Sequence, residues 1–167
     1  EKGSELPQGD SRRKYNYRVV FQGNRVVNQN WEVALSQDLG SSPAAMEAGK
    51  AVDCYGSFEG HESMQADAEQ AYVQAWLKGP ATWNLLPNEA WPEGWEGKWR
   101  KPVVILKRAL YGHPDAGTFW ERHCDDCLRR GGFVPIQTWQ SCYWHPKLKL
   151  FLIVYVDDFK MAGPIKN

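Results

Sequence analysis

The feature that most constrains this sequence is an uninterrupted apolar run that stops at two adjacent acids. Residues 150–156 contain no charged side chain, and Asp157 and Asp158 follow them directly. A strand that is apolar at every position is typical of one covered on both faces, because its side chains alternate between the faces of the sheet. Two carboxylates at the end of such a strand are costly through desolvation and mutual repulsion. The sequence therefore predicts either a solvated turn here or a site for a hard divalent cation such as Mg²⁺.

The size and composition of the chain fit one folded domain. Its 167 residues are enough to bury a core, and 43% of them are hydrophobic, which excludes a largely disordered polypeptide. No stretch approaches 18 consecutive apolar residues, so the sequence predicts no transmembrane helix and no membrane partner. Residues 1–13 are polar, lack the apolar core of a secretory signal and are predicted to be a flexible lead-in. We therefore expect a single folded unit over residues 14–167.

Hydrophobic periodicity predicts an α+β fold. Residues 43–55 and 114–130 have apolar side chains at helical spacing, and both segments begin at a proline and end before a glycine. Residues 103–106 form a short apolar run that is typical of a buried strand. The strands predicted from β-branched and aromatic content are residues 15–21, 63–67, 82–86, 103–106, 141–145 and 150–156. The predicted apolar face of the second helix comprises Ala116, Phe119, Trp120, Cys124, Cys127 and Leu128.

The cysteines suggest one alternative. Four cysteines in a chain without an export signal favour reduced thiols or a metal site over a disulfide framework. Cys124 and Cys127, followed by Cys142 and His145, have the two-pair spacing of a structural zinc module. Against zinc, the first pair lies inside a predicted helix and shares a face with Leu128, which is typical of small core residues. A structural zinc-binding module is therefore the weaker alternative.

Four motifs occur in order along the chain. Residues 14–25 form a basic, β-rich stretch, and Asp67 lies five positions before Tyr72. Residues 106–112 read Leu-Lys-Arg-Ala-Leu-Tyr-Gly before a predicted helix, and residues 155–158 read Tyr-Val-Asp-Asp. Together these motifs resemble those of reverse transcriptases, and the third resembles most specifically the copia-type LTR retrotransposon enzymes.

The resemblance covers most of the chain, from about residue 14 to residue 163, and it implies a fold and an activity. The fold would be reverse-transcriptase-like fingers and palm, with an antiparallel palm sheet and a catalytic hairpin packed on helices. The activity would be that of an RNA-directed DNA polymerase acting on an RNA/DNA template–primer and deoxynucleoside triphosphates, within a longer Pol polyprotein. No thumb or ribonuclease H sequence is recognised, so we expect a fragment that is incomplete at its C-terminus.

The resemblance assigns catalysis to three carboxylates. Asp67, Asp157 and Asp158 would be both the catalytic and the metal-binding residues. They would hold two Mg²⁺ ions, with Mn²⁺ as the alternative ion, in a two-metal nucleotidyl transfer. Asp158 would support the other two carboxylates instead of acting as a full ligand.

The resemblance also assigns substrate contacts. Tyr72 would exclude the 2′-hydroxyl of the incoming sugar. Tyr111 and Gly112 would lie against the substrate, and Gly112 would let the backbone approach the nucleotide or template closely because it has no side chain. Lys14 or Arg18 would bind the triphosphate through charge-assisted hydrogen bonds.

Two observations keep a second function open. The 20 basic residues are balanced by 20 acidic ones, whereas nucleic-acid-binding proteins usually carry a basic surplus. Tyr72 stands where copia-type enzymes more often have Phe, and His113, Asp115 and Gly117 stand where they usually have more basic or bulky residues. Retroelement copies also decay, and this sequence stops nine residues after Asp158. The main alternative is therefore a catalytically inactive retroelement remnant that acts only as a binding module.

Overall fold

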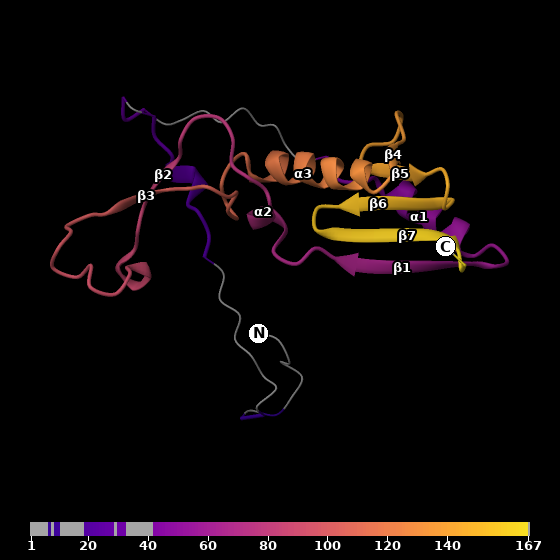
Figure 1. Cartoon of the computed structure of the whole chain (residues 1–167), viewed down its shortest axis with the longest axis horizontal. Helices are drawn as coiled ribbons and strands as arrows, with labels where there is room; N and C mark the ends of the chain where they lie inside the picture. Colours follow the sequence, from indigo (N-terminus) through magenta and orange to yellow (C-terminus); the bar gives the residue numbers. More distant parts are fainter. Residues whose placement is uncertain (1–6, 8, 11–18, 29, 33–41, 167) are drawn as a thin grey trace.

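The main layer of the protein is an antiparallel sheet. The computed structural model describes residues 7, 9–10, 19–28, 30–32 and 42–166. Within them, five strands pair in the order β1-β7-β6-β5-β4 (Figure 1). These strands are β1 (His61–Asp67), β4 (Val134–Pro135), β5 (Cys142–His145), β6 (Leu150–Tyr155) and β7 (Asp158–Pro164). The predicted α+β class with an antiparallel sheet is confirmed.

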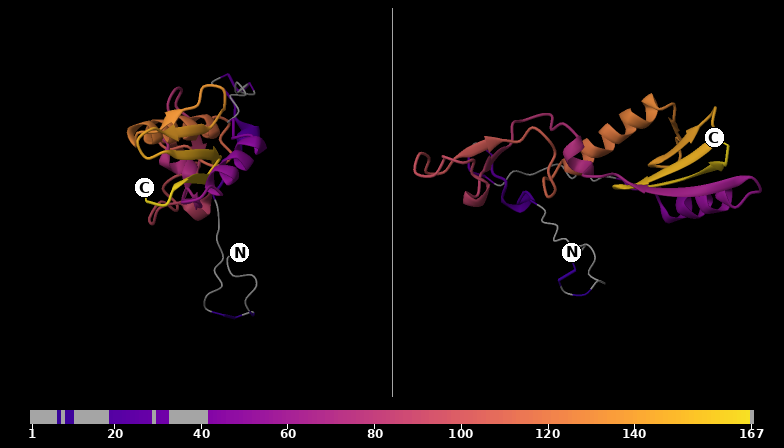
Figure 2. Two further views of the ribbon diagram at one scale, coloured as in Figure 1. Left: turned by 90° about the vertical axis from the view of Figure 1, so that its right-hand side faces the viewer. Right: turned by 60° about the horizontal axis from the view of Figure 1, so that its bottom comes forward.

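Two helices cover opposite faces of this sheet (Figure 2). They are α1 (Met46–Gly56) and α3 (Ala116–Arg130). In β6, Phe151 and Ile153 pack in the cluster formed with α1, whereas Leu152 and Val154 pack in the cluster formed with α3. All four side chains are buried. The prediction that both faces of this strand are covered is therefore confirmed.

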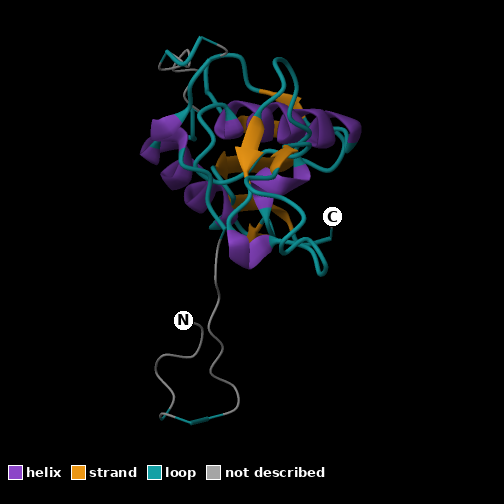
Figure 3. Ribbon diagram, turned by 90° about the vertical axis from the view of Figure 1, so that its left-hand side faces the viewer, coloured by secondary structure: helices purple, strands orange, loops and turns teal. Residues whose placement is uncertain are grey.

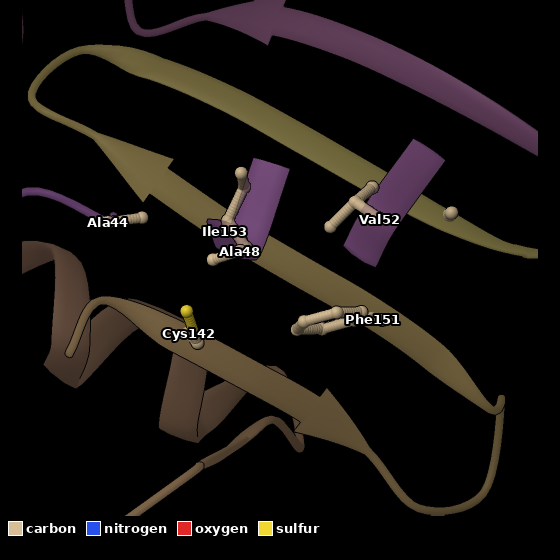
Figure 4. Close-up of a cluster of buried hydrophobic side chains, with 7 residues drawn as sticks. Ala44, Ala48, Val52, Cys142, Phe151 and Ile153 are labelled. Carbon is tan, nitrogen blue, oxygen red and sulfur yellow. The ribbon is translucent and has the colours of Figure 1, made fainter. Parts of the chain in front are cut away.

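Small side chains let α1 lie close to the sheet. Ala48 and Val52 face Cys142 of β5 and the aliphatic and aromatic side chains of β6 (Figure 4). Val52 and Cys142 are the largest side chains that are almost completely buried, at 0% and 1% exposure. An ion pair of 2.5 Å between Lys160 Nζ and Asp53 Oδ1 also joins β7 to α1.

A two-stranded ribbon lies apart from the main sheet (Figure 1), and it faces the viewer in front of the sheet in the end-on view (Figure 3). It consists of β2 (Trp83–Leu85) and β3 (Val103–Ile105). The short helix α2 (Ala71–Gln74) lies between β1 and the ribbon in the chain. Two 3₁₀ turns complete the described elements, η1 (Gly23–Arg25) and η2 (Asn88–Ala90). The prediction that residues 103–106 are buried is wrong, because Val103 is 56% and Ile105 36% exposed. The ribbon is covered on one face only, so alternate side chains point to solvent. Within residues 103–106, Val104 and Leu106 are the two half-buried residues.

Two further predictions need correction or lie beyond the described residues. Cys127 is exposed, although the sequence predicts it on the buried face of α3. The α3 residues that pack on the sheet are spaced by four: Trp120, Cys124 and Leu128. The apolar stripe of this helix is therefore narrower than predicted. Residues 19–21 form no strand, while residues 15–18 and most of the lead-in 1–13 lie outside the described part. Among the described helices, none is long and apolar enough to cross a membrane.

Candidate active site at the end of the sheet

The structure brings the backbone of Asp67 beside that of Asp157 and Asp158. Asp67, the last residue of β1, is the register partner of Asp158, the first residue of β7. Residues directly opposite in an antiparallel pair project from the same face, with Cβ atoms roughly 4.5–5.5 Å apart. The Ala68 N–H also donates a hydrogen bond of 2.7 Å to the Asp157 carbonyl oxygen. We call Asp67, Asp157 and Asp158 the aspartate corner.

The two adjacent aspartates sit on a tight hairpin turn. Tyr155 pairs with Asp158, so Val156 and Asp157 are the two central residues of the turn between β6 and β7. Val156 has a φ of 58°, which is unfavourable for a β-branched residue. The indole Nε1 of Trp120 donates a hydrogen bond of 2.6 Å to the Val156 carbonyl oxygen. Helix α3 therefore holds the strained turn in place, a role for Trp120 that its helical spacing did not reveal.

The aspartate corner has the donor chemistry that a hard cation requires. Carboxylate oxygens are the usual protein ligands of Mg²⁺. Asp67 and Asp158 are exposed and Asp157 is half-buried, so the corner is open to solvent. Among the described residues, no three His, Cys, Asp or Glu side chains are already gathered as one metal-ligand set. The backbone thus brings the three aspartate residues together, and rotation of their side chains determines whether their carboxylates can share an ion.

Two predicted substrate-contact residues, Tyr72 and Tyr111, pack against each other. The rings of Tyr72 in α2 and Tyr111 meet edge to face, with centroids 4.5 Å apart. Burial raises the pKa of the Tyr72 phenol, and the negative charge of Asp157 and then the neighbouring Tyr111 raise it further. The structure therefore packs Tyr111 against Tyr72, and Tyr72 lies close enough to Asp157 to be affected by its charge.

Gly112 has a structural reason to be glycine within the chain itself. Its φ is 86°, and a Cβ atom at this position would overlap the Phe21 carbonyl oxygen. The Phe21 N–H donates a hydrogen bond of 2.6 Å to the Tyr111 carbonyl oxygen, which holds the two segments together. The segment that approaches Gly112 is thus residues 21–23, and the predicted approach of a nucleotide or template stays a prediction. Lys14 and Arg18 lie outside the described residues.

His113 connects three segments around this glycine. Its Nε2 lies 3.2 Å from Thr82 Oγ1 beside the ribbon, and its Nδ1 accepts a hydrogen bond of 3.2 Å from the Asp115 N–H before α3. Its ring also contacts the Phe21 ring, with centroids 5.2 Å apart. Burial lowers the pKa of this imidazole, against an opposing effect of the Asp115 carboxylate. His113 is therefore held by contacts with residues from three separate segments.

An open groove lies along α2. It has a volume of about 550 Å³ and is lined by Glu69, Gln70, Val73, Gln74 and Arg108. The Arg108 guanidinium lies 3.8 Å from the centre of the Trp76 ring and donates a hydrogen bond of 2.5 Å to the Gln74 carbonyl oxygen. These contacts hold Arg108 in place at the rim, and sequence reasoning did not single it out.

The four residues of the zinc alternative do not converge. Cys124 packs in the cluster on the α3 face of the sheet, whereas Cys142 packs in the cluster on the α1 face. His145 instead accepts a hydrogen bond of 3.1 Å from the Leu148 N–H at Nδ1, while its Nε2 lies 3.2 Å from the Gly131 carbonyl oxygen. All four cysteines of the chain are free thiols. The arrangement therefore supplies no zinc site from these residues.

Comparison with known proteins gives no family assignment. A scan against protein-family models, a search of curated proteins and a search of solved structures each return no match.

Proposed function

We propose that this chain is the fingers and palm part of an RNA-directed DNA polymerase similar to copia-type reverse transcriptases. The observation that carries the proposal is the register of β1 with β7, which sets Asp67 opposite Asp158 beside the Tyr-Val-Asp-Asp turn. The order of the sequence motifs supports it independently, and so does the electrostatic effect of Asp157 on the Tyr72 phenol. If Asp157 and Asp158 were only a solvated turn, there would be no reason to expect a third acid, Asp67, opposite Asp158 on the neighbouring strand.

The residues have distinct roles in this proposal. Asp67 and Asp157 would hold two Mg²⁺ ions, and Asp158 would support them with its charge. Bound there, the ions would supply Lewis-acid activation of a primer 3′-hydroxyl and neutralisation of charge on a pyrophosphate leaving group. Tyr72 lies beneath the incoming sugar and excludes a 2′-hydroxyl. The chain does little covalent chemistry, because positioning and charge stabilisation supply most of the rate.

Primer extension tests the proposal. The full chain is incubated with a labelled DNA primer on an RNA template, deoxynucleoside triphosphates and Mg²⁺ or Mn²⁺. We expect template-directed extension that Asp157→Asn abolishes and that Asp126→Asn, a change on the exposed side of α3, leaves intact. Extension that survives in Asp157→Asn contradicts the mechanism. A chain that binds the template–primer but extends it with neither ion favours the inactive binding module.

A further inference from the structure

The outer side of α3 carries a histidine and a cysteine one helical turn apart. His123 and Cys127 are four residues apart, so their side chains lie one above the other on the helix. Cys127 Sγ lies 3.7 Å from His123 Nε2. Cys127 is exposed and His123 is half-buried, so solvent reaches the pair. The pair shares only Cys127 with the four residues of the zinc alternative.

The separation of these two atoms fits a shared metal ion. A tetrahedral zinc ion binds a thiolate sulfur at about 2.3 Å and an imidazole nitrogen at about 2.0–2.1 Å. A tetrahedral angle between bonds of these lengths sets the sulfur and the nitrogen roughly 3.5 Å apart. The observed distance of 3.7 Å is close to this value. A small rotation of either side chain therefore lets both atoms contact one ion, with no change in the helix backbone.

Neighbouring side chains orient both members of the pair. The Trp120 ring lies beside the His123 ring, with centroids 6.0 Å apart and an angle of 36° between the planes. The Arg130 guanidinium donates a hydrogen bond of 3.1 Å to Cys127 Sγ. A guanidinium has no acceptor atom and cannot itself bind a metal ion. Its hydrogen bond suits a negatively charged sulfur, and thiolates bound to metals accept such bonds.

The other cysteines do not offer an equivalent pair. Burial raises the pKa of the Cys124 thiol to about 12 and also raises the pKa of the Cys142 thiol. Both groups therefore stay protonated near neutral pH, whereas the thiolate is the form that binds metals. Cys54 in α1 is exposed, but the residues four positions before and after it are Lys50 and Phe58. Cys54 thus serves as a matched control without a histidine one turn away.

We propose that His123 and Cys127 bind one zinc-like divalent ion, with water at its remaining coordination positions. Sulfur and imidazole ligands select such an ion, whereas Mg²⁺ selects oxygen ligands. On binding, the sulfur–hydrogen bond is replaced by a sulfur–metal bond and the proton passes to solvent, while the neutral imidazole binds through Nε2. Among the described residues, no third His, Cys, Asp or Glu completes a set with this pair. The site is therefore open and the ion exchangeable.

This site goes beyond the proposed polymerase activity, because it uses neither the aspartate corner nor its ligand chemistry. Trp120 is the α3 residue that reaches the turn at Val156, and Cys127 lies seven residues further along the helix. At a rise of about 1.5 Å per residue, that is roughly 10 Å along the helix axis. Ions at the two sites can therefore be measured separately.

Cadmium titration tests the site, because Cd²⁺ binds thiolates as zinc does and the bond gives an ultraviolet charge-transfer band. The full chain, with its thiols kept reduced, is titrated with Cd²⁺ in excess Mg²⁺. We expect the band to saturate at about one ion per chain. Cys127→Ser should abolish the band, and His123→Gln should lower the Cd²⁺ affinity about tenfold or more. Circular dichroism checks that each variant is folded.

The control variant separates this pair from general thiol chemistry. Cys54→Ser, at the other exposed cysteine, should leave the band and the affinity unchanged. A band that persists in Cys127→Ser, an unchanged affinity in His123→Gln, or equal loss of the band in Cys54→Ser would each overturn the proposal. One ion shared by two chains would also overturn it, since water would then not complete the site. Asp157→Asn should keep the band, so failure of this site and failure of primer extension are distinguishable.

Discussion

Asp67 and Asp158 face each other across the neighbouring strands β1 and β7, at the end of the sheet where the β6–β7 hairpin turns. The hydrogen bond from the Ala68 N–H to the Asp157 carbonyl oxygen fixes the same two segments one residue further on. The first acid is therefore tied to the turn by the backbone ladder, and it does not depend on side-chain contacts for its position.

Cation binding at the aspartate corner can be measured without polymerase activity. Asp67→Asn and Asp157→Asn should each lower the affinity for Mn²⁺ by roughly tenfold or more, because each removes a charged oxygen ligand. Calorimetric titration or the loss of the free Mn²⁺ resonance signal reports the affinity. Asp126→Asn on α3 is the control and should bind Mn²⁺ normally. Unchanged affinity in both corner variants would remove this site as the ion-binding one.

Tyr72 should govern the choice of sugar. Tyr72→Ala removes the ring beside Asp157 and should raise the incorporation of ribonucleotides relative to deoxyribonucleotides. Tyr72→Phe keeps the ring and should retain selectivity. Single-nucleotide extension with matched ribo- and deoxyribonucleoside triphosphates gives the ratio of ribonucleotide to deoxyribonucleotide incorporation. If the ratio is the same in Tyr72→Ala as in the wild type, Tyr72 is only a packing residue.

Gly112→Ala should destabilise the fold more than the same change at an equally left-handed glycine in open space. Gly97 has a φ of 74°, and an added Cβ atom there would meet nothing within 4 Å. Gly97→Ala should therefore cost about 1–2 kcal/mol through backbone strain alone. At Gly112 the added Cβ atom also meets the Phe21 carbonyl oxygen. Gly112→Ala should therefore lower the free energy of unfolding by at least about 1 kcal/mol more than Gly97→Ala does. Urea unfolding of the two variants gives the comparison, and equal losses would show that the contact with residue 21 is not maintained.

His113 should make stability depend on pH. Burial lowers the pKa of His113 in the folded chain below the value of about 6.5 expected in the unfolded chain. Its contribution to stability is therefore fully present above about pH 6.5, and it is lost as the pH falls, because the unfolded chain takes up the proton first. Urea unfolding at pH 7.5 and at lower pH gives the free energy of unfolding at each pH. This free energy should fall less with decreasing pH in His113→Gln than in the wild type. The same decrease in both proteins would contradict this role.

Local patterns in the sequence determined most of the secondary structure. The two longer helices and strands β1, β2, β5 and β6 lie within a few residues of the predicted ranges, because apolar periodicity and the prolines and glycines at element ends act over short distances. The two-sided burial of β6 also follows from its composition alone, since no face of it is polar. The class of the fold was predictable for the same reason.

Tertiary structure alone decided which of these elements meet. The sequence could not show that β1 pairs with β7, that Trp120 holds the Val156 carbonyl, or that Phe21 is what Gly112 accommodates, because each contact joins segments far apart in the chain. It was also misleading for Val103 and Ile105, since an apolar strand is buried only where another layer covers it. Composition determines what a strand can bury, and its neighbours in space determine what it does bury.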